Sequence, residues 1–150
     1  MEAKALAAHI QAIIAAAEKR IPEFLANPED QNNNNGNCAI CIVDAAGNVH
    51  GKMFGSDKIR QRHSFRIAWI KASQVWITGL KTGEFETQVY AGKIDEHHFG
   101  ISRPDFIGWE GGQPIVVDGQ TRLSVGFSGF RGTSDLEIVQ KTVADVTARK

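Results

Sequence analysis

The stretch Gly108-Trp-Glu-Gly-Gly-Gln-Pro-Ile-Val-Val-Asp-Gly119 says most about the fold of this chain. Its paired glycines precede an apolar, β-branched run that is typical of a strand, predicted here over 113–118. The dipeptide Asp118-Gly119 predicts a tight turn, and residues 122–128 predict the returning strand. The stretch therefore predicts a β-hairpin. At its entrance, the Gly111-Gly112 loop can bring backbone N–H groups close to an anionic ligand.

A second hairpin is predicted nearer the N-terminus. Residues 38–44 are mostly apolar, as in a buried strand, the segment 44–48 is rich in turn-forming residues, and 48–54 return as a strand. The first of these strands carries both cysteines, Cys38 and Cys41, in a C-x-x-C spacing. Residues three apart in a strand point to opposite faces, which favours two packing thiols over a redox pair.

Helices are predicted on either side of these hairpins. Apolar residues recur at helical spacing over 3–25, and a long helix is predicted over 57–80, with Ser56 as its N-cap. The long helix has apolar residues on two flanks, which is typical of a helix between two layers or at a subunit interface. The capping-box pattern Ser134-Asp-Leu-Glu137 predicts the start of a final helix.

Two segments are expected to be less regular. Residues 27–37 are polar and rich in asparagine, and we expect a mobile loop there. Residues 81–107 contain several glycines and a proline and predict short helices and loops. Hairpins require an antiparallel sheet, and three helices must cover at least one of its faces. The sequence thus predicts a single α+β domain over residues 1–150.

Composition narrows the classes of partner. Lys and Arg together number 17, as do Asp and Glu, so the net charge is zero. This balance argues against a nucleic-acid partner and is compatible with self-association. No apolar run approaches the roughly 18 residues of a membrane span, and the apolar run at 12–17 is shorter than a signal-peptide core. We therefore expect a cytoplasmic protein with no membrane partner.

The motifs, taken in order, resemble a known family. They are Val43-Asp-Ala-Ala-Gly-Asn48, Ser64-x-x-Ile-Ala-x-x-Lys-Ala72, the run 111–119 and Val125-Gly-Phe-Ser-Gly129. With the final helix they span roughly residues 38–146. In this order they resemble the GlcG/HbpS-like haem-degrading-domain family, which includes the C-terminal domain of PduO-type proteins.

The resemblance implies a profilin-like or roadblock-like fold, a five-stranded antiparallel sheet with helices packed on both sides. It also implies a homodimer or a larger ring such as an octamer, and haem or a corrinoid as the bound cofactor. The sequence departs from the family pattern at the Asn-rich insertion, at Arg122 and Ser124, and at the two tryptophans Trp69 and Trp76.

Several residues are candidates for a ligand site near the Gly-Gly-x-Pro loop. A basic side chain can pair with a carboxylate or a haem propionate, and a haem iron requires an axial ligand such as histidine. No metal site of protein ligands alone is predicted, because the consecutive residues 95–98 cannot easily converge on one ion. The candidate ligand contacts are Gly111, Gly112, Arg103, Trp109, Lys71 and Arg66, and the candidate axial ligands are His9, His63, His97 and His98.

Three functions are compatible with the sequence. The first is a small-ligand-binding protein that holds haem or a corrinoid near the Gly-Gly loop. The second is an enzyme acting on a small carbonyl or carboxylate metabolite, with Lys71, Glu110 or His98 as catalytic groups. The third is an oligomeric accessory protein with a structural role.

Overall fold

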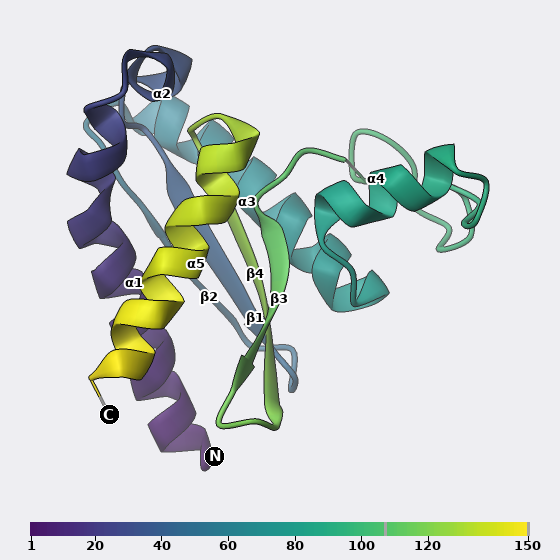
Figure 1. Ribbon diagram of the computed structural model, residues 1–150, viewed down its shortest axis with the longest axis horizontal. Coiled ribbons are helices and arrows are strands. Elements are labelled where there is room, and N and C mark those ends of the chain that lie inside the picture. The colour runs from purple at the N-terminus through teal and green to yellow at the C-terminus, as the bar shows by residue number, and fades with distance from the viewer. Residues whose placement is uncertain (107, 150) are drawn as a thin grey trace.

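The computed structural model describes residues 1–106 and 108–149, which form helices and one antiparallel sheet (Figure 1). The strands are β1 (Ala39–Asp44), β2 (Val49–Met53), β3 (Gly112–Val117) and β4 (Thr121–Ser128). The helices are α1 (Ala3–Leu25), α2 (Pro28–Asn34), α3 (Lys58–Thr78), α4 (Thr82–Tyr90) and α5 (Gly132–Ala148). Both predicted hairpins are present, and the order of strands across the sheet is β2-β1-β4-β3.

The predicted α+β class is confirmed, whereas the expectation of five strands is wrong for the described residues. The sheet has four strands there. The segment between α3 and β3 contributes α4 and turns but no further strand to this sheet in the described residues. That segment is rich in glycine and charged residues and lacks the alternating apolar pattern of a half-buried strand.

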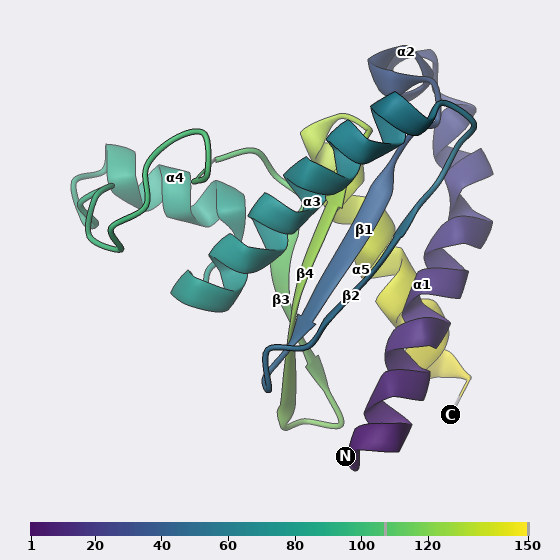
Figure 2. The same cartoon turned by 180° about the vertical axis from the view of Figure 1, so that it is seen from behind.

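Helices cover both faces of the sheet. Figure 1 shows α1 and α5 lying across one face, and Figure 2 shows α3 lying across the other. The alternation of β1 explains why both faces are apolar: Cys38, just before the strand, Ile40 and Ile42 join the core beneath α1 and α5. Ala39, Cys41 and Val43 pack against Ala68 and Ala72 of α3.

The two cysteines therefore lie on opposite faces, as predicted from their spacing in a strand. Both are free and buried, and burial raises the pKa of each thiol to about 12. Because the thiolate is the reactive form, these are packing residues.

Helix α3 can approach the sheet closely because β4 has a glycine beneath it. A Cβ atom on Gly126 would fall 2.1 Å from the carbonyl oxygen of Ala68 and 2.7 Å from the amide nitrogen of Ala72. Only glycine fits between strand and helix backbone at this distance. The outer face of α3 stays uncovered, and it exposes Trp69, Trp76 and Ile77.

Three local predictions are corrected by the structure. Residues 28–34, expected in a mobile loop, form α2, which begins at the Asn27 side-chain cap with Pro28 in its first turn. The N-cap of α3 is Asp57 rather than Ser56, since the Asp57 carboxylate accepts hydrogen bonds from the amides of Ile59 and Arg60. Helix α5 begins at Gly132, two residues before the expected capping box.

The residues of that capping box therefore have other partners. The Ser134 hydroxyl donates to Asp30, and Glu137 pairs with Lys141.

Helix α4 and the loop that follows it project sideways from the sheet and its covering helices in both views (Figures 1 and 2). We call residues 82–106 the α4 arm. Phe85 and Phe106 are buried within it and pack edge to face. None of the described helices has an apolar stretch long enough to cross a bilayer.

Candidate functional site

A hollow lies where the Gly-Gly loop meets α3 and the start of α5. We call it the corner hollow, and its volume is about 430 Å³. Ligand sites in proteins typically measure about 300–1,000 Å³. Its lining comes from the C-terminal end of α2, residues 63–71 of α3, residues 109–110, and the segment 128–135.

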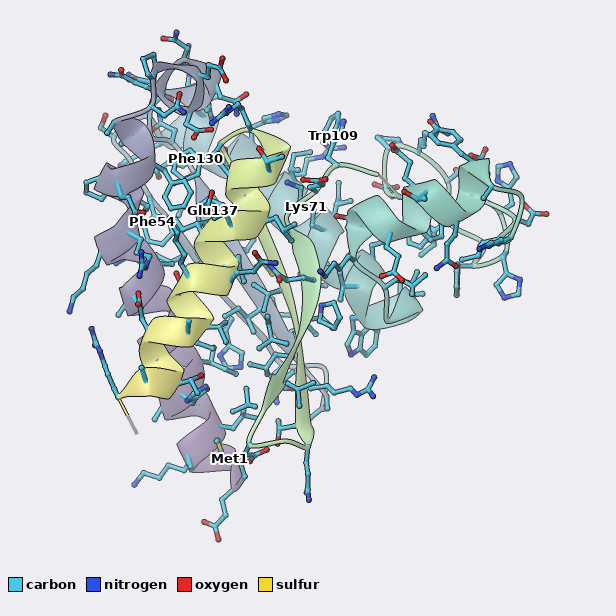
Figure 3. The ribbon with its side chains drawn as sticks, viewed as in Figure 1. Met1, Phe54, Lys71, Trp109, Phe130 and Glu137 are labelled. Atoms are coloured by element: carbon cyan, nitrogen blue, oxygen red, sulfur yellow. The ribbon has the colours of Figure 1, made fainter. Side chains whose placement is uncertain are left out.

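The corner hollow brings together several of the residues predicted from the sequence. His63 and Lys71 reach it from α3, and Trp109 and Glu110 reach it from the loop before β3. Trp109 is 62% exposed, so most of its indole surface is available to a ligand. Figure 3 shows Lys71 and Trp109 at the junction of the sheet and the α4 arm, at the end of the molecule away from Met1.

Lys71 is buried at this site and does not reach solvent along the helix surface. Its Nζ donates to the carbonyl oxygen of Phe127 at 2.8 Å and to Oδ2 of Asp135 at 3.0 Å. The Asp135 carboxylate also accepts a hydrogen bond from the amide of Phe130 at 2.9 Å. Lys71 is therefore paired with a carboxylate of the protein itself.

Burial has the largest effect on the pKa values of Lys71 and Asp135. It lowers the pKa of Lys71, and the nearby Asp135 and Glu110 carboxylates offset only part of that effect. It raises the pKa of Asp135 to about 7, against the pull of Lys71 and of the Phe130 amide. Moving the proton from amine to carboxylate therefore costs much less here than in water.

The two glycines of the loop also have structural roles next to the Lys71–Asp135 pair. Gly111 has a φ of +116°, and a Cβ atom there would fall 2.9 Å from Nζ of Lys71 and 2.8 Å from Cβ of Asp135. The amide of Gly112 donates to the hydroxyl of Thr82, which in turn donates to the carbonyl of Trp109. The Gly112 N–H is thus engaged within the protein, although both glycines line a smaller pocket of about 170 Å³ beside the corner hollow.

The other predicted residues lie elsewhere. Arg103 and His97 line a pocket of about 200 Å³ in the α4 arm, with Trp109 at its edge. Arg103 pairs there with Glu96 at 3.0 Å. Arg66 is exposed on α3, three residues beyond His63.

Two of the candidate axial ligands line neither the corner hollow nor the two smaller pockets described above. His98 is exposed and packs edge-on against Phe99 in the α4 arm. His9 belongs to α1, on the other face of the sheet from α3. In the part of the chain that the structure describes, no three His, Cys, Asp or Glu side chains gather as a metal site.

One rim of the corner hollow was not predicted from the sequence. The Asp30 carboxylate, only 1% exposed, accepts hydrogen bonds from the backbone and the guanidinium of Arg131 and from the hydroxyl of Ser134. Burial alone would raise the pKa of Asp30, but these hydrogen bonds outweigh it and hold the pKa below its ordinary value. The side-chain amide of Asn33 donates to the backbone carbonyls of Gly129 and Phe130, both at 3.0 Å.

Helix α2 is thereby fixed to the segment that lines the hollow. The asparagine-rich composition masked this helix, yet the order Asn27-Pro28-Glu29 is a helix-start pattern that could have revealed it.

The fold and this corner place the chain among small α+β domains with a sheet between helices. Within that class, the family model described as a haem-degrading, HbpS-like protein matches residues 6–144. The chain therefore belongs to the HbpS-like family, as its motifs indicated. A search of curated proteins found no significant match.

Solved structures share the fold at low sequence identity. The protein ORFY of Klebsiella pneumoniae superposes with a TM-score of 0.72 at 22% identity, covering 94% of this chain and 89% of its own. A complex of PduOC with haem gives 0.69 at 19% identity, covering 91% and 90%. A double mutant of HbpS from Streptomyces reticuli gives 0.56 at 18% identity, covering 88% and 84%. At these identities the likeness establishes the fold.

Proposed function

We propose that this protein binds haem at the corner hollow, with His63 as the axial ligand of the iron. The position of His63 in the structure is the observation that supports this proposal. Of the four candidate histidines, His63 is the one that lines the corner hollow, where it is joined by the exposed indole of Trp109. The family description and the PduOC–haem complex among the structural neighbours support haem as the ligand.

The chemistry of the lining fits a tetrapyrrole. A neutral imidazole binds haem iron, and a flat aromatic side chain packs against the macrocycle. Arg66 lies three residues after His63, so the two side chains share one face of α3, and the guanidinium can pair with a propionate. Haem bound here would supply an iron centre for ligand or redox chemistry, and His63, Trp109 and Arg66 would supply an imidazole nitrogen, a stacking surface and a cationic partner.

The proposal is tested by titrating purified protein with hemin and recording the Soret band. We expect saturation at one haem per chain, with cobalamin as the corrinoid comparison. His63→Ala is expected to weaken binding at least about tenfold, a loss of roughly 1.4 kcal/mol. His98→Ala, at an exposed position outside the three pockets, is the matched control and should bind as the unmodified protein does. Unchanged affinity in His63→Ala, or a larger loss in His9→Ala, would contradict the assignment.

We further propose that the protein self-associates through the outer face of α3. A homodimer or a ring needs a surface that one chain can bury against another. Trp69 is 41% exposed and Trp76 is 52% exposed, seven residues apart on the same helix face. Exposed apolar patches of this kind are typical of protein interfaces. Light scattering should report a smaller particle mass for Trp76→Lys than for the unmodified protein, and an identical mass would exclude this face.

The proposed compartment is the cytoplasm, with which two free thiols are compatible.

A further inference from the structure

The buried amine of Lys71 is a reactive group that haem binding at His63 does not use. It is 2% exposed, yet both Lys71 and its partner Asp135 contribute atoms to the wall of the corner hollow. An ammonium has three hydrogens, and Phe127 and Asp135 are its two hydrogen-bond acceptors among the described residues. Desolvation is one of the conditions under which a lysine amine acts as a nucleophile, and Lys71 meets it.

The backbone around the amine is kept free of side chains. A Cβ atom on Gly111 would fall 2.9 Å from Nζ, and one on Gly126 would fall 2.9 Å from Cβ of Lys71. Gly111 also has a φ of +116°, which side-chain-bearing residues rarely adopt. Glycine at 111 therefore leaves no side chain against the nitrogen on the side of the loop.

The charges near the amine favour a neutral reactant. The Asp135 carboxyl is hydrogen-bonded to Lys71, and Glu110 is close enough to act on its pKa. Arg131, the cation across the hollow, is paired with Asp30 at 3.0 Å and also bonds Glu29. Beside the Lys71–Asp135 pair, the Glu110 carboxylate adds a further negative charge, and it would repel a reactant that carries a carboxylate.

We propose that Lys71 reversibly captures a small neutral aldehyde as an imine, with Asp135 relaying the protons. This activity goes beyond haem binding and does not depend on it. Capture requires space for a few carbon atoms, and the corner hollow that Lys71 lines has a volume of about 430 Å³.

The step balances without any further reactant. Asp135 takes a proton from the Lys71 ammonium, and the neutral amine attacks the carbonyl carbon, forming an N–C bond while the C=O electron pair moves to oxygen. That oxygen takes up the proton held by Asp135, and the nitrogen returns one to the carboxylate. Asp135 then protonates the hydroxyl group, which leaves as water as the C=N bond forms. One ammonium and one aldehyde give one protonated imine and one water, and Asp135 ends as it began.

The titration behaviour of the pair supports this route. Burial lowers the pKa of the Lys71 amine and raises that of Asp135, so the neutral amine and the carboxylic acid are both more accessible here than in water. Each unit by which an amine pKa falls increases its neutral fraction about tenfold.

Reductive trapping of the haem-free protein tests the proposal. The protein is incubated with butanal and cyanoborohydride at neutral pH, and modified lysines are located by peptide mass mapping. We expect Lys71 to be alkylated at least about tenfold faster than Lys58 and Lys81, which are exposed and serve as internal controls. Glyoxylate, a small aldehyde that carries a carboxylate, should label Lys71 much more slowly than butanal relative to Lys81.

Two further measurements separate positioning from folding. In urea the advantage of Lys71 over Lys81 should vanish. In Asp135→Asn, where circular dichroism shows that the variant is folded, the rate at Lys71 should fall while the rate at Lys81 stays unchanged. The proposal is overturned if native Lys71 reacts no faster than Lys81, or if glyoxylate labels Lys71 as fast as butanal does. Neither result bears on the haem titration, so failure of one proposal leaves the other standing.

Discussion

At the scale of single residues, Lys71 and Asp135 are the most consequential pair in the molecule. They are 2% and 4% exposed at their side chains and lie 3.0 Å apart. Removing one partner of a buried pair leaves an uncompensated group in a poorly solvated site, which is why such pairs tolerate few substitutions. Gly111 belongs to the same unit, since its missing side chain makes room for both partners.

The pair predicts an unusual pH dependence of stability. The pKa of Asp135 is raised from 3.8 to about 7, so the folded state binds the proton more tightly than the unfolded state does. The resulting stabilisation is complete below about pH 4 and is lost as the pH rises through about 7, on the order of a few kcal/mol. The difference in unfolding free energy between the unmodified protein and Asp135→Asn should therefore be larger at pH 5 than at pH 7.5, as measured by urea unfolding.

Asp145→Asn is the matched control for this measurement. Its hydrogen bond and ion pair with Arg20 lower the pKa of Asp145, so its contribution is complete above its unfolded pKa of about 4. The effect of Asp145→Asn should not change between pH 5 and pH 7.5. If the difference in unfolding free energy between the unmodified protein and Asp135→Asn instead grew with pH, folding would favour the carboxylate of Asp135 over its acid form.

At the scale of elements, α2 builds part of the site despite its composition. Its one buried residue, Asp30, holds Arg131 and Ser134 at the start of α5, and its exposed Asn33 bonds to the end of the β4 segment. The asparagine-rich insertion thus forms one wall of the corner hollow. The family motifs gave no indication of that wall, because the insertion lies outside them.

This role of α2 predicts a specific loss of stability. Asp30→Ala removes the acceptor for the Arg131 backbone and side chain and for Ser134, and hydrogen bonds to charged groups contribute about 1.5–3 kcal/mol each. Arg131 is 40% exposed, and solvent weakens its bonds to Asp30. We therefore expect Asp30→Ala to lower the free energy of unfolding, measured in urea, by about 2–3 kcal/mol. Hydrogen exchange should also accelerate over residues 28–34.

Asn32→Ala provides the comparison, since Asn32 is exposed on the same helix and should change stability by about 0.5 kcal/mol or less. Equal effects of the two substitutions would mean that α2 is not held by Asp30.

The elements differ in how well the sequence predicts them, for identifiable reasons. The hairpin around Asp118-Gly119 and the long helices follow from turn chemistry and periodicity, and they lie close to where they were expected. Helix α2 was missed because its residues have low helix propensity and it depends on tertiary contacts with Arg131 and Gly129. The start of α5 was misplaced because Ser134 and Glu137 have partners that were not visible in the sequence.

The candidate site, like the secondary structure, can be predicted from the sequence only in part. Proximity of Lys71, Trp109 and Glu110 follows once α3 is known to lie against the strand that continues the Gly-Gly loop. The partner of Lys71 does not follow from the sequence, because Asp135 lies 64 residues further along the chain, inside a pattern typical of a capping box. The histidines could not be ranked without the fold, since periodicity does not say which face of the sheet a helix covers.

At the scale of the whole molecule, the four-stranded sheet separates two environments. The face beneath α1 and α5 holds the larger apolar cluster, while α3 brings charged and polar residues to the corner hollow. The α4 arm extends from the same end and shares Trp109 between its own pocket and the corner hollow. A ligand seated against Trp109 would therefore lie between the sheet domain and the arm.

The position of iron in crystals of the haem-loaded protein would show directly whether haem binds at the corner hollow. Anomalous scattering locates the iron independently of any fitted macrocycle. We expect a single peak per chain at bonding distance from the imidazole of His63, beside Trp109. A peak next to His9 on α1, or next to His97 in the α4 arm, would contradict it.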